Sequence, residues 1–207
     1  MTSPNAGRRR QAVQNDRVIL DAAREVFLAD PRAPVSAVAK RAGVGFAALY
    51  RRYPAKEDLL RTLCHDGLRV FVAEASAAAA EPDPVLALTG FLERVVDADV
   101  HSLTVHLAGT FVPTVEMGVD AERASTLTGA LFVRARDRLR PDAVLDDLTL
   151  LLEACAAVRV PEPDRTRVLR RRVLALMVRS LLDVEDPRAL PGPPPNADEM
   201  GWRWRAG

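Results

Sequence analysis

The residues best suited to a chemical task lie close together between Pro34 and Lys56, in the segment PVSAVAKRAGVGFAALYRRYPAK. Arg51 and Arg52 end one short apolar stretch, and Lys56 stands at the start of the next. Cationic side chains at helix ends suit phosphate oxygens, and so do backbone N–H groups that lack a partner in the first turn of a helix. The segment is therefore a candidate for contact with a polyanion.

Two short helices joined by a glycine-containing turn are expected to position these cations. The first has apolar residues at i, i+3, i+4 and i+7, namely Val35, Val38, Ala39 and Ala42. Gly43 suits a left-handed helix end, and a second helix is predicted from Phe46 to about Arg52. This arrangement is typical of a helix-turn-helix, whose second helix enters the DNA major groove. The alternative is a plain helical hairpin with solvated arginines.

Longer helices are expected on both sides of this pair. Apolar spacing predicts one helix over about 11–29, ended by Asp30-Pro31, and another from about residue 55 into the alanine-rich stretch 75–80. Residues 1–10 are predicted to be a disordered basic arm because they carry Arg8, Arg9 and Arg10 without an apolar pattern. Such an arm either enters a minor groove or stays solvated.

The charge of the chain is divided unevenly. Its formal net charge is only +1, but residues 1–61 contain 12 basic and 6 acidic residues, whereas the remainder contains 17 basic and 22 acidic residues. A basic head on an acidic body indicates nucleic acid or another anionic surface as the partner of the head.

At these residues the chain resembles the TetR family of bacterial transcriptional repressors. The resemblance covers about residues 15–62 and rests on RVILDAAREVF (17–27), AVAKRAGVG (37–45) and LYRRYPAKEDLL (49–60). It implies an all-α fold of about nine helices. A three-helix helix-turn-helix DNA-binding domain (11–55) would precede a helical effector-binding and dimerisation domain (56–185). A Pro-rich disordered tail (186–207) is expected to follow.

The resemblance also implies roles for individual residues. Tyr50 and Lys56 would contact phosphates, and Arg51 and Arg52 would reach phosphates or flanking bases. The residues nearest the base edges would be Gly45, Phe46, Ala47 and Ala48.

Two positions depart from the family pattern. Pro34 stands where the family often has Ser or Thr as helix cap and phosphate ligand, and Ser36 is the expected substitute. Ala48 replaces a frequent Thr or Ser, so the reading face is apolar. Thymine methyl contacts then become plausible, and specificity would depend on Arg51, Arg52, the backbone or DNA shape.

Further amphipathic helices are expected at about 85–99, 103–111, 121–139, 145–158 and 164–184, with Pro113 and Gly118 breaking the pattern between the second and third. In the family the last two helices of each subunit form a four-helix bundle, which implies a homodimer. Both helices here carry largely apolar faces that could equally be internal core: Leu148, Leu151, Leu152 and Cys155, then Val168, Leu169, Val173, Leu176, Met177, Ser180 and Leu181. Each helix also has a second apolar edge, formed by Leu150 and Ala154 on the first and by Leu174 and Val178 on the second. This favours a role for both helices in the internal core and in the dimer interface. A two-fold dimer would read a pseudo-palindrome with half-sites about 34–36 Å apart.

The resemblance implies a small-molecule pocket in the acidic body. Each candidate lining residue could instead be plain core; the candidates are Phe71, Phe91, His106, Phe111, Met117, Phe132 and Cys155. Asp97 and His101 share one helix face, but an exposed polar pair is the expected interpretation because a metal site needs more ligands. No metal and no cofactor is predicted.

Other function classes find little support in the sequence. Cys64, His65 and Asp66 are consecutive, so on a helix they point about 100° apart and cannot form a catalytic relay. No nucleotide-binding loop or hydrolase motif is present, and an enzyme is not expected. Two cysteines and no membrane-length apolar stretch favour a cytoplasmic protein.

The expected function is a ligand-responsive repressor that leaves a palindromic operator when an effector binds. The helix from Lys56 to Phe71 and beyond would link DNA to pocket. One alternative is an effector-independent dimeric DNA-binding protein, which a packed body would favour. The other is a helical protein–protein or membrane-surface adaptor, although the head lacks a large exposed apolar helix face.

Overall fold

The computed structural model describes residues 4–107, 110–182, 189–196 and 199–200, with side chains described from residue 15 onward except at 104–106. Within these ranges all regular secondary structure is helical. The α-helices are α1 (Pro4–Ala29), α2 (Val35–Ala42), α3 (Phe46–Arg52), α4 (Lys56–Ala78), α5 (Pro84–Asp97), α6 (Val100–Leu107), α7 (Val115–Ala135), α8 (Leu145–Ala157) and α9 (Pro163–Leu181), and a 3-10 turn spans Arg136–Arg138. The predicted all-α fold is confirmed.

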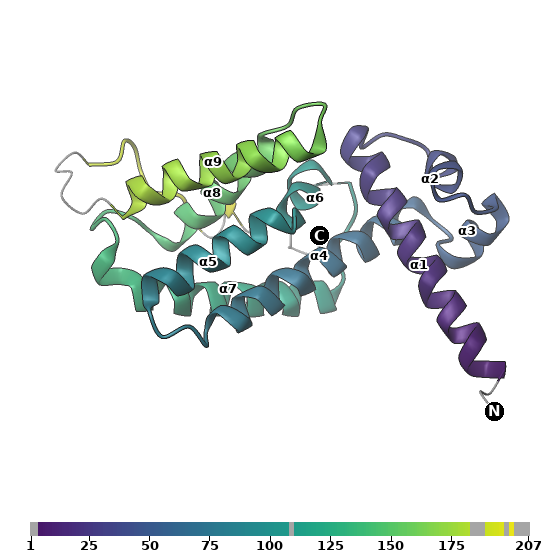
Figure 1. Cartoon of the computed structure of the whole chain (residues 1–207), viewed down its shortest axis with the longest axis horizontal. Coiled ribbons are helices and arrows are strands. Elements are labelled where there is room, and N and C mark those ends of the chain that lie inside the picture. The colour runs from purple at the N-terminus through teal and green to yellow at the C-terminus, as the bar shows by residue number, and fades with distance from the viewer. Residues whose placement is uncertain (1–3, 108–109, 183–188, 197–198, 201–207) are drawn as a thin grey trace.

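The molecule has an elongated shape with two ends (Figure 1). We call α1–α3 the head and α5–α9 the body. Helix α4 begins beside the head at Lys56 and runs into the body, where it packs against α5, α6 and α7. Helix α4 is therefore a continuous connection between the head and the body.

The turn between α2 and α3 has the geometry that the sequence predicts. Gly43 adopts a left-handed conformation with φ of 66°, and the N–H of Val44 donates to the carbonyl of Ala39 at 3.1 Å. A side chain at residue 43 would be strained in this conformation, which is why glycine ends α2 here. The bounds of α2 and α3 agree with the sequence prediction.

Two predictions about chain order or helix breaks are wrong. Residues 4–10, expected in a disordered arm, belong to α1, since Pro4 suits a first helical position and the following Ala, Arg and Gln residues favour helix. Gly118 lies inside α7, which begins at Val115 because the Thr114 hydroxyl caps it by accepting from the N–H of Met117 at 3.3 Å.

The described tail residues contact the body at two points. The N–H of Leu190 donates to the Asp142 carboxylate at 2.7 Å, and Met200 lines a cavity in the body. Residues 189–194 are exposed and form no helix, and a disordered tail stays a prediction. The other tail residues, 186–188, 197–198 and 201–207, lie outside the described residues.

Two apolar cores stabilise the chain. The head core centres on Phe27, Leu49 and Leu59, and Leu103 and Leu107 of α6 enter it from the body. The body core gathers α5, α7, α8 and α9 around residues such as Phe91. Because α6 contributes side chains to the head core, the head and the body are packed against each other and are not joined by a flexible linker alone.

A group of polar side chains also connects the head with the body, and Asp99 lies at its centre. Asp99 lies between α5 and α6 with φ of 52°, which is uncommon for a residue other than glycine. Its carbonyl accepts from Arg24 of α1 at 3.1 Å, and its carboxylate is paired with Arg170 of α9. Arg170 is 5% exposed and also donates to the carbonyls of Val158 at 2.9 Å and Ala156 at 3.2 Å.

Both cysteines should be unreactive in the folded protein. Burial raises the pKa of the Cys64 thiol to about 12 and that of the Cys155 thiol to about 11, so the nucleophilic thiolate is scarce at pH 8. We expect Ellman's reagent at pH 8 to label neither thiol in the native protein and both after unfolding. Labelling of native protein at the rate of free cysteine would contradict this burial.

Candidate DNA-binding surface and body cavity

Helix α3 is anchored by one residue and exposed elsewhere. Leu49 is completely buried in the head core, whereas Phe46, Ala47 and Ala48 are exposed and Gly45 precedes them in the turn. A helix held by its inner face leaves its outer face rigid and open, as a helix that enters a groove requires. The predicted base-edge residues thus share one exposed surface.

An aromatic pair extends this exposed surface. The rings of Phe46 and Tyr50 lie 4.5 Å apart with an interplanar angle of 54°, and both side chains remain exposed, at 52% and 40%. The contact restricts the Tyr50 ring, so its hydroxyl is presented from a fixed position.

The two arginines at the end of α3 differ in their partners. Arg52 makes a two-point pair with Asp16 of α1, with Nε–Oδ1 and Nη2–Oδ2 distances of 2.8 Å. The hydrogen bond and charge of Asp16 raise the pKa of Arg52. Arg51 is exposed and has no ion-pair or hydrogen-bond partner among the described residues. Arg51 is therefore the free cation at this helix end, whereas Arg52 must exchange a carboxylate for a phosphate.

Lys56 has a structural role that the sequence did not reveal. Its ammonium donates to the carbonyls of Pro31 and Ala33, both at 2.9 Å, and lies 4.9 Å from the centre of the Phe27 ring. Since an ammonium has three N–H donors, one remains for a phosphate. Ser36 is exposed on the first turn of α2, and Pro34 gives that helix no side-chain cap.

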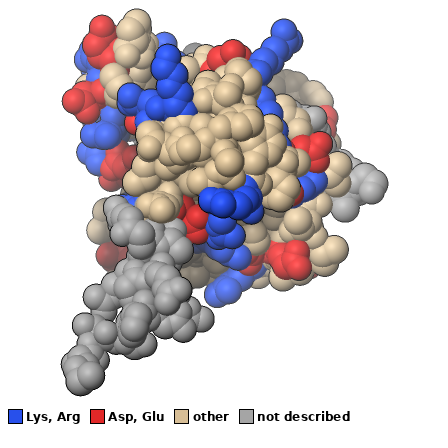
Figure 2. Space-filling model, turned by 90° about the vertical axis from the view of Figure 1, so that its right-hand side faces the viewer, with Lys and Arg blue, Asp and Glu red and all other residues tan. Residues whose placement is uncertain are grey.

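Figure 2 views the molecule from the head end. It shows a broad uncharged area bordered by Lys and Arg side chains, with a few acidic groups among them. An uncharged centre with a basic border suits DNA, because phosphates flank the base edges of a groove.

Lys56→Ala should destabilise the head. The substitution leaves the carbonyls of Pro31 and Ala33 without their donor, and an unpaired buried polar group costs about 1–3 kcal/mol. We expect urea unfolding to show this loss, whereas Lys40→Ala, at an exposed position on α2, should leave the midpoint unchanged. Equal urea midpoints for the two variants would contradict a stabilising role of the Lys56 hydrogen bonds.

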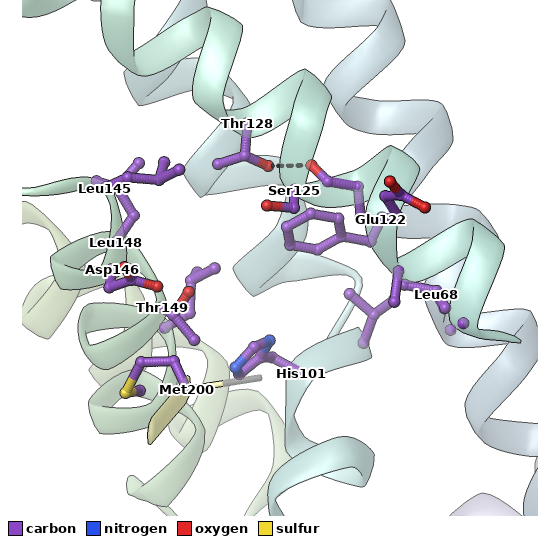
Figure 3. Close-up of a pocket in the computed structure, with 17 residues that line it drawn as sticks. Leu68, His101, Glu122, Ser125, Thr128, Leu145, Asp146, Leu148, Thr149 and Met200 are labelled. Carbon is purple, nitrogen blue, oxygen red and sulfur yellow. Dashed lines mark hydrogen bonds between the residues drawn. The ribbon is translucent and has the colours of Figure 1, made fainter. Parts of the chain in front are cut away.

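A cavity of about 370 Å³ opens in the body between α4, α6, α7 and α8. Figure 3 shows its walls, with Asp146 and Leu145 on one side and Glu122 and Leu68 on the other. The described lining residues are Gly67, Leu68, Phe71, Val100, His101, Gly118, Ala121, Glu122, Ala124, Ser125, Thr128, Leu145, Asp146, Leu148, Thr149, Leu152 and Met200. Its size is in the range of small-molecule sites.

Of the candidate pocket residues, the structure places Phe71 on the wall of this cavity. Phe91 packs edge-on against Phe71, with ring centres 5.1 Å apart, and is fully buried in the body core. The other described candidates fill packing positions: Met117 and Phe111 in or against the head core, and Phe132 and Cys155 in the body core. The side chain of His106 lies outside the described residues.

A signal in the sequence could have located the cavity. Gly118, Ala121 and Ser125 recur at helical spacing on α7, and such small side chains leave space that larger neighbours do not fill. A search for large aromatic residues finds the core instead, because those residues fill space.

The predicted dimer helices use most of their apolar residues within one protomer. Leu148, Leu151 and Leu152 of α8 are buried in the body core, and Leu174 and Leu181 of α9 join them. Apolar side chains remain exposed at Leu150 (49%), Val168 (54%) and Leu176 (56%). Asp97 is not paired with His101; it makes an ion pair with Arg171 of α9.

The sequence model of the tetR family of bacterial regulatory proteins matches residues 19–63 of this chain. These residues run from within α1 to the start of α4. Residues 19–63 of this chain are therefore a DNA-binding domain of the tetR family of transcriptional regulators. The match coincides with the segment that presents α3.

Solved tetR-family structures have the same fold. The LfrR regulator of Mycobacterium smegmatis, solved in complex with proflavine, is 22% identical with a TM-score of 0.63, covering 86% of this chain and 99% of its own. PfmR of Thermus thermophilus is 21% identical with a TM-score of 0.62, covering 79% of this chain and 98% of its own. A regulator from Streptomyces coelicolor is 24% identical with a TM-score of 0.56, covering 81% and 98%. No curated protein sequence matches the chain.

No helix among the described residues is both long and apolar enough to cross a membrane. The same part of the chain holds no cluster of three or more His, Cys, Asp or Glu side chains arranged to bind a metal ion.

Proposed function

We propose that this tetR-family chain is a ligand-responsive repressor that binds a palindromic operator as a homodimer and leaves it when a small molecule enters the body. The observation that carries the proposal is the rigid, exposed and apolar outer face of α3. Leu49 holds the helix from behind, and the exposed Arg51 stands at its end.

In this proposal α3 lies in the major groove. Ala47, Ala48 and Phe46 meet base edges, where methyl and ring groups suit thymine methyls. Gly45 allows close approach of the backbone, and Ser36 reaches a phosphate from α2.

The phosphate contacts come from the border of the same face. Tyr50 and Arg51 are free to contact phosphates, and Lys56 contributes its remaining N–H. Arg52 joins them by exchanging Asp16 for a phosphate oxygen. The contacts position the head on DNA, and the apolar face selects the sequence.

The second protomer is proposed to pack on α8 and α9. Leu150, Val168 and Leu176 supply exposed apolar side chains, and the buried faces of both helices fix their orientation within the protomer. Two-fold symmetry then sets two copies of α3 about one helical turn of DNA apart.

Helix α4 supplies the coupling in this proposal. Gly67, Leu68 and Phe71 of α4 line the cavity. The same helix begins at Lys56, whose ammonium donates to carbonyls of the loop between α1 and α2. An effector that prefers a displaced α4 by about 1–3 kcal/mol would weaken operator binding roughly 5–150-fold. The proflavine complex of LfrR supports small-molecule binding by a body of this fold.

Selection of bound DNA from a random pool tests the proposal. We expect enrichment of one palindrome whose half-sites are about 10 base pairs apart and which binds two protomers. A pool that shows only salt-sensitive binding without an enriched sequence would contradict operator recognition.

A further inference from the structure

We propose that the effector of this chain is an organic cation with an apolar or aromatic body, held between Glu122 of α7 and Asp146 of α8. This inference rests on the proposed function, since it names the class of molecule that the body cavity takes. It is carried by the charges and side chains that line the cavity.

Both residues line the same cavity on opposite walls, with Asp146 half-buried and Glu122 exposed at the edge (Figure 3). Neither side chain has an ion-pair or hydrogen-bond partner among the described residues. The neighbouring carboxylate behaves differently, because Asp147 caps α8 by accepting from the N–H of Val144 at 2.8 Å. Asp146 is thus not needed for the helix end, and its charge is available to a ligand.

Among the described residues, no cationic side chain of Lys or Arg lines the cavity. The titratable groups of its described lining are Glu122, Asp146 and the imidazole of His101. Partial burial raises the pKa of Asp146, and the nearby charges of Asp147 and Glu199 raise it further. A nearby cation favours the charged carboxylate and would offset both effects, whereas a bound anion would add to them.

The rest of the wall suits the apolar part of such a molecule. Leu68, Val100, Leu145, Leu148 and Leu152 contribute aliphatic surface. Phe71 adds an aromatic ring, held in place by the edge-to-face contact with Phe91. An aromatic face attracts a cation, and its attraction grows as water is excluded.

A metal ion fits the cavity poorly. Hard divalent cations take six or more oxygen ligands, and the described lining offers two carboxylates on opposite walls among mostly apolar groups. The described residues also contain no cluster of three or more metal-ligating side chains. The cation is therefore organic.

Three probes of similar bulk and different charge test the class: tetraphenylphosphonium, triphenylphosphine oxide and tetraphenylborate. None is planar, so none intercalates into DNA and operator binding can be followed in the same samples. By calorimetry on the full-length protein, we expect the phosphonium to bind at least tenfold more tightly than the neutral oxide, and the borate to bind most weakly.

The variants locate the contact. Asp146→Asn should weaken phosphonium binding about tenfold, and Glu122→Gln should weaken it as well, with little effect on the oxide. Asp164→Asn is the matched control, because Asp164 is exposed at the start of α9 and does not line the cavity. An oxide that binds as tightly as the phosphonium, no phosphonium binding, or phosphonium binding unaffected by Asp146→Asn would overturn the proposal.

Operator binding separates this inference from the proposed function. If the phosphonium binds through Asp146 but operator affinity is unchanged, the cation site stands and induction by ligand fails. If the neutral oxide binds as well as the phosphonium and releases the operator, induction stands and the cationic class fails.

Discussion

Ala47→Glu is expected to abolish specific DNA binding, with a loss of affinity of about a hundredfold or more. Ala47 lies on the exposed outer face of α3, where our proposal places it against base edges between two phosphate backbones. A carboxylate there meets like charges at close range, and such a juxtaposition costs several kcal/mol. Fluorescence anisotropy on the selected operator measures the loss.

The fold should survive this substitution. Position 47 is the second residue of α3, and a negative side chain near a helix N-terminus is favourable. Ala130→Glu is the matched control, because it places the same side chain on α7 in the body, away from the head. Operator affinity should be unchanged in this control. Retained affinity in Ala47→Glu would exclude α3 from the interface.

Arg170→Met is expected to give the largest loss of stability, about 3–5 kcal/mol, because it removes the buried partner of an ion pair together with its hydrogen bonds to two carbonyls. Arg170 is 5% exposed, and its guanidinium pairs with Asp99 while it donates to the carbonyls of Val158 and Ala156. Without it, the carboxylate and both carbonyls lose their donor. Urea unfolding at fixed protein concentration measures the effect.

Arg171→Met provides the comparison for Arg170→Met. Arg171 is the next residue of α9 and pairs with Asp97, but its side chain is 59% exposed. Exposed ion pairs contribute little, so the unfolding midpoint of this variant should stay close to that of the native protein. A similar loss of unfolding free energy in both variants would show that the burial of Arg170 does not determine how much its ion pair with Asp99 stabilises the fold.

The head was largely predictable from sequence because its signals are local. Apolar spacing predicted α2, Gly43 predicted the left-handed turn, and the motif around Tyr50 predicted an exposed reading helix. Each of these features depends on residues only a few positions apart. The family match over residues 19–63 agrees with that interpretation.

The partners of the cations were not predictable in the same way. Lys56 contacts carbonyls 23 and 25 residues earlier, and Arg52 pairs with Asp16, which is 36 residues away. Such contacts depend on the path of the chain in three dimensions. Charge at the end of a helix therefore predicted a phosphate contact but not the internal pairing that competes with it.

The cavity was misjudged for a related reason. Large apolar residues such as Phe91 and Met117 fill the cores, whereas the cavity lies where α7 has Gly118, Ala121 and Ser125. Composition identifies residues that can be buried but not the places where packing is incomplete. The position of Met200 on the cavity wall was equally hidden, because a proline-rich tail carries no helical pattern.

The contact between the apolar face of α3 and the major groove is tested most directly by replacing thymine with uracil at single positions of the selected operator. The change removes one methyl group and leaves base pairing and phosphates intact. We predict weaker binding at a few thymines, placed symmetrically in both half-sites and with no change elsewhere. Equal affinity for every uracil-substituted operator would contradict reading of the DNA by this face.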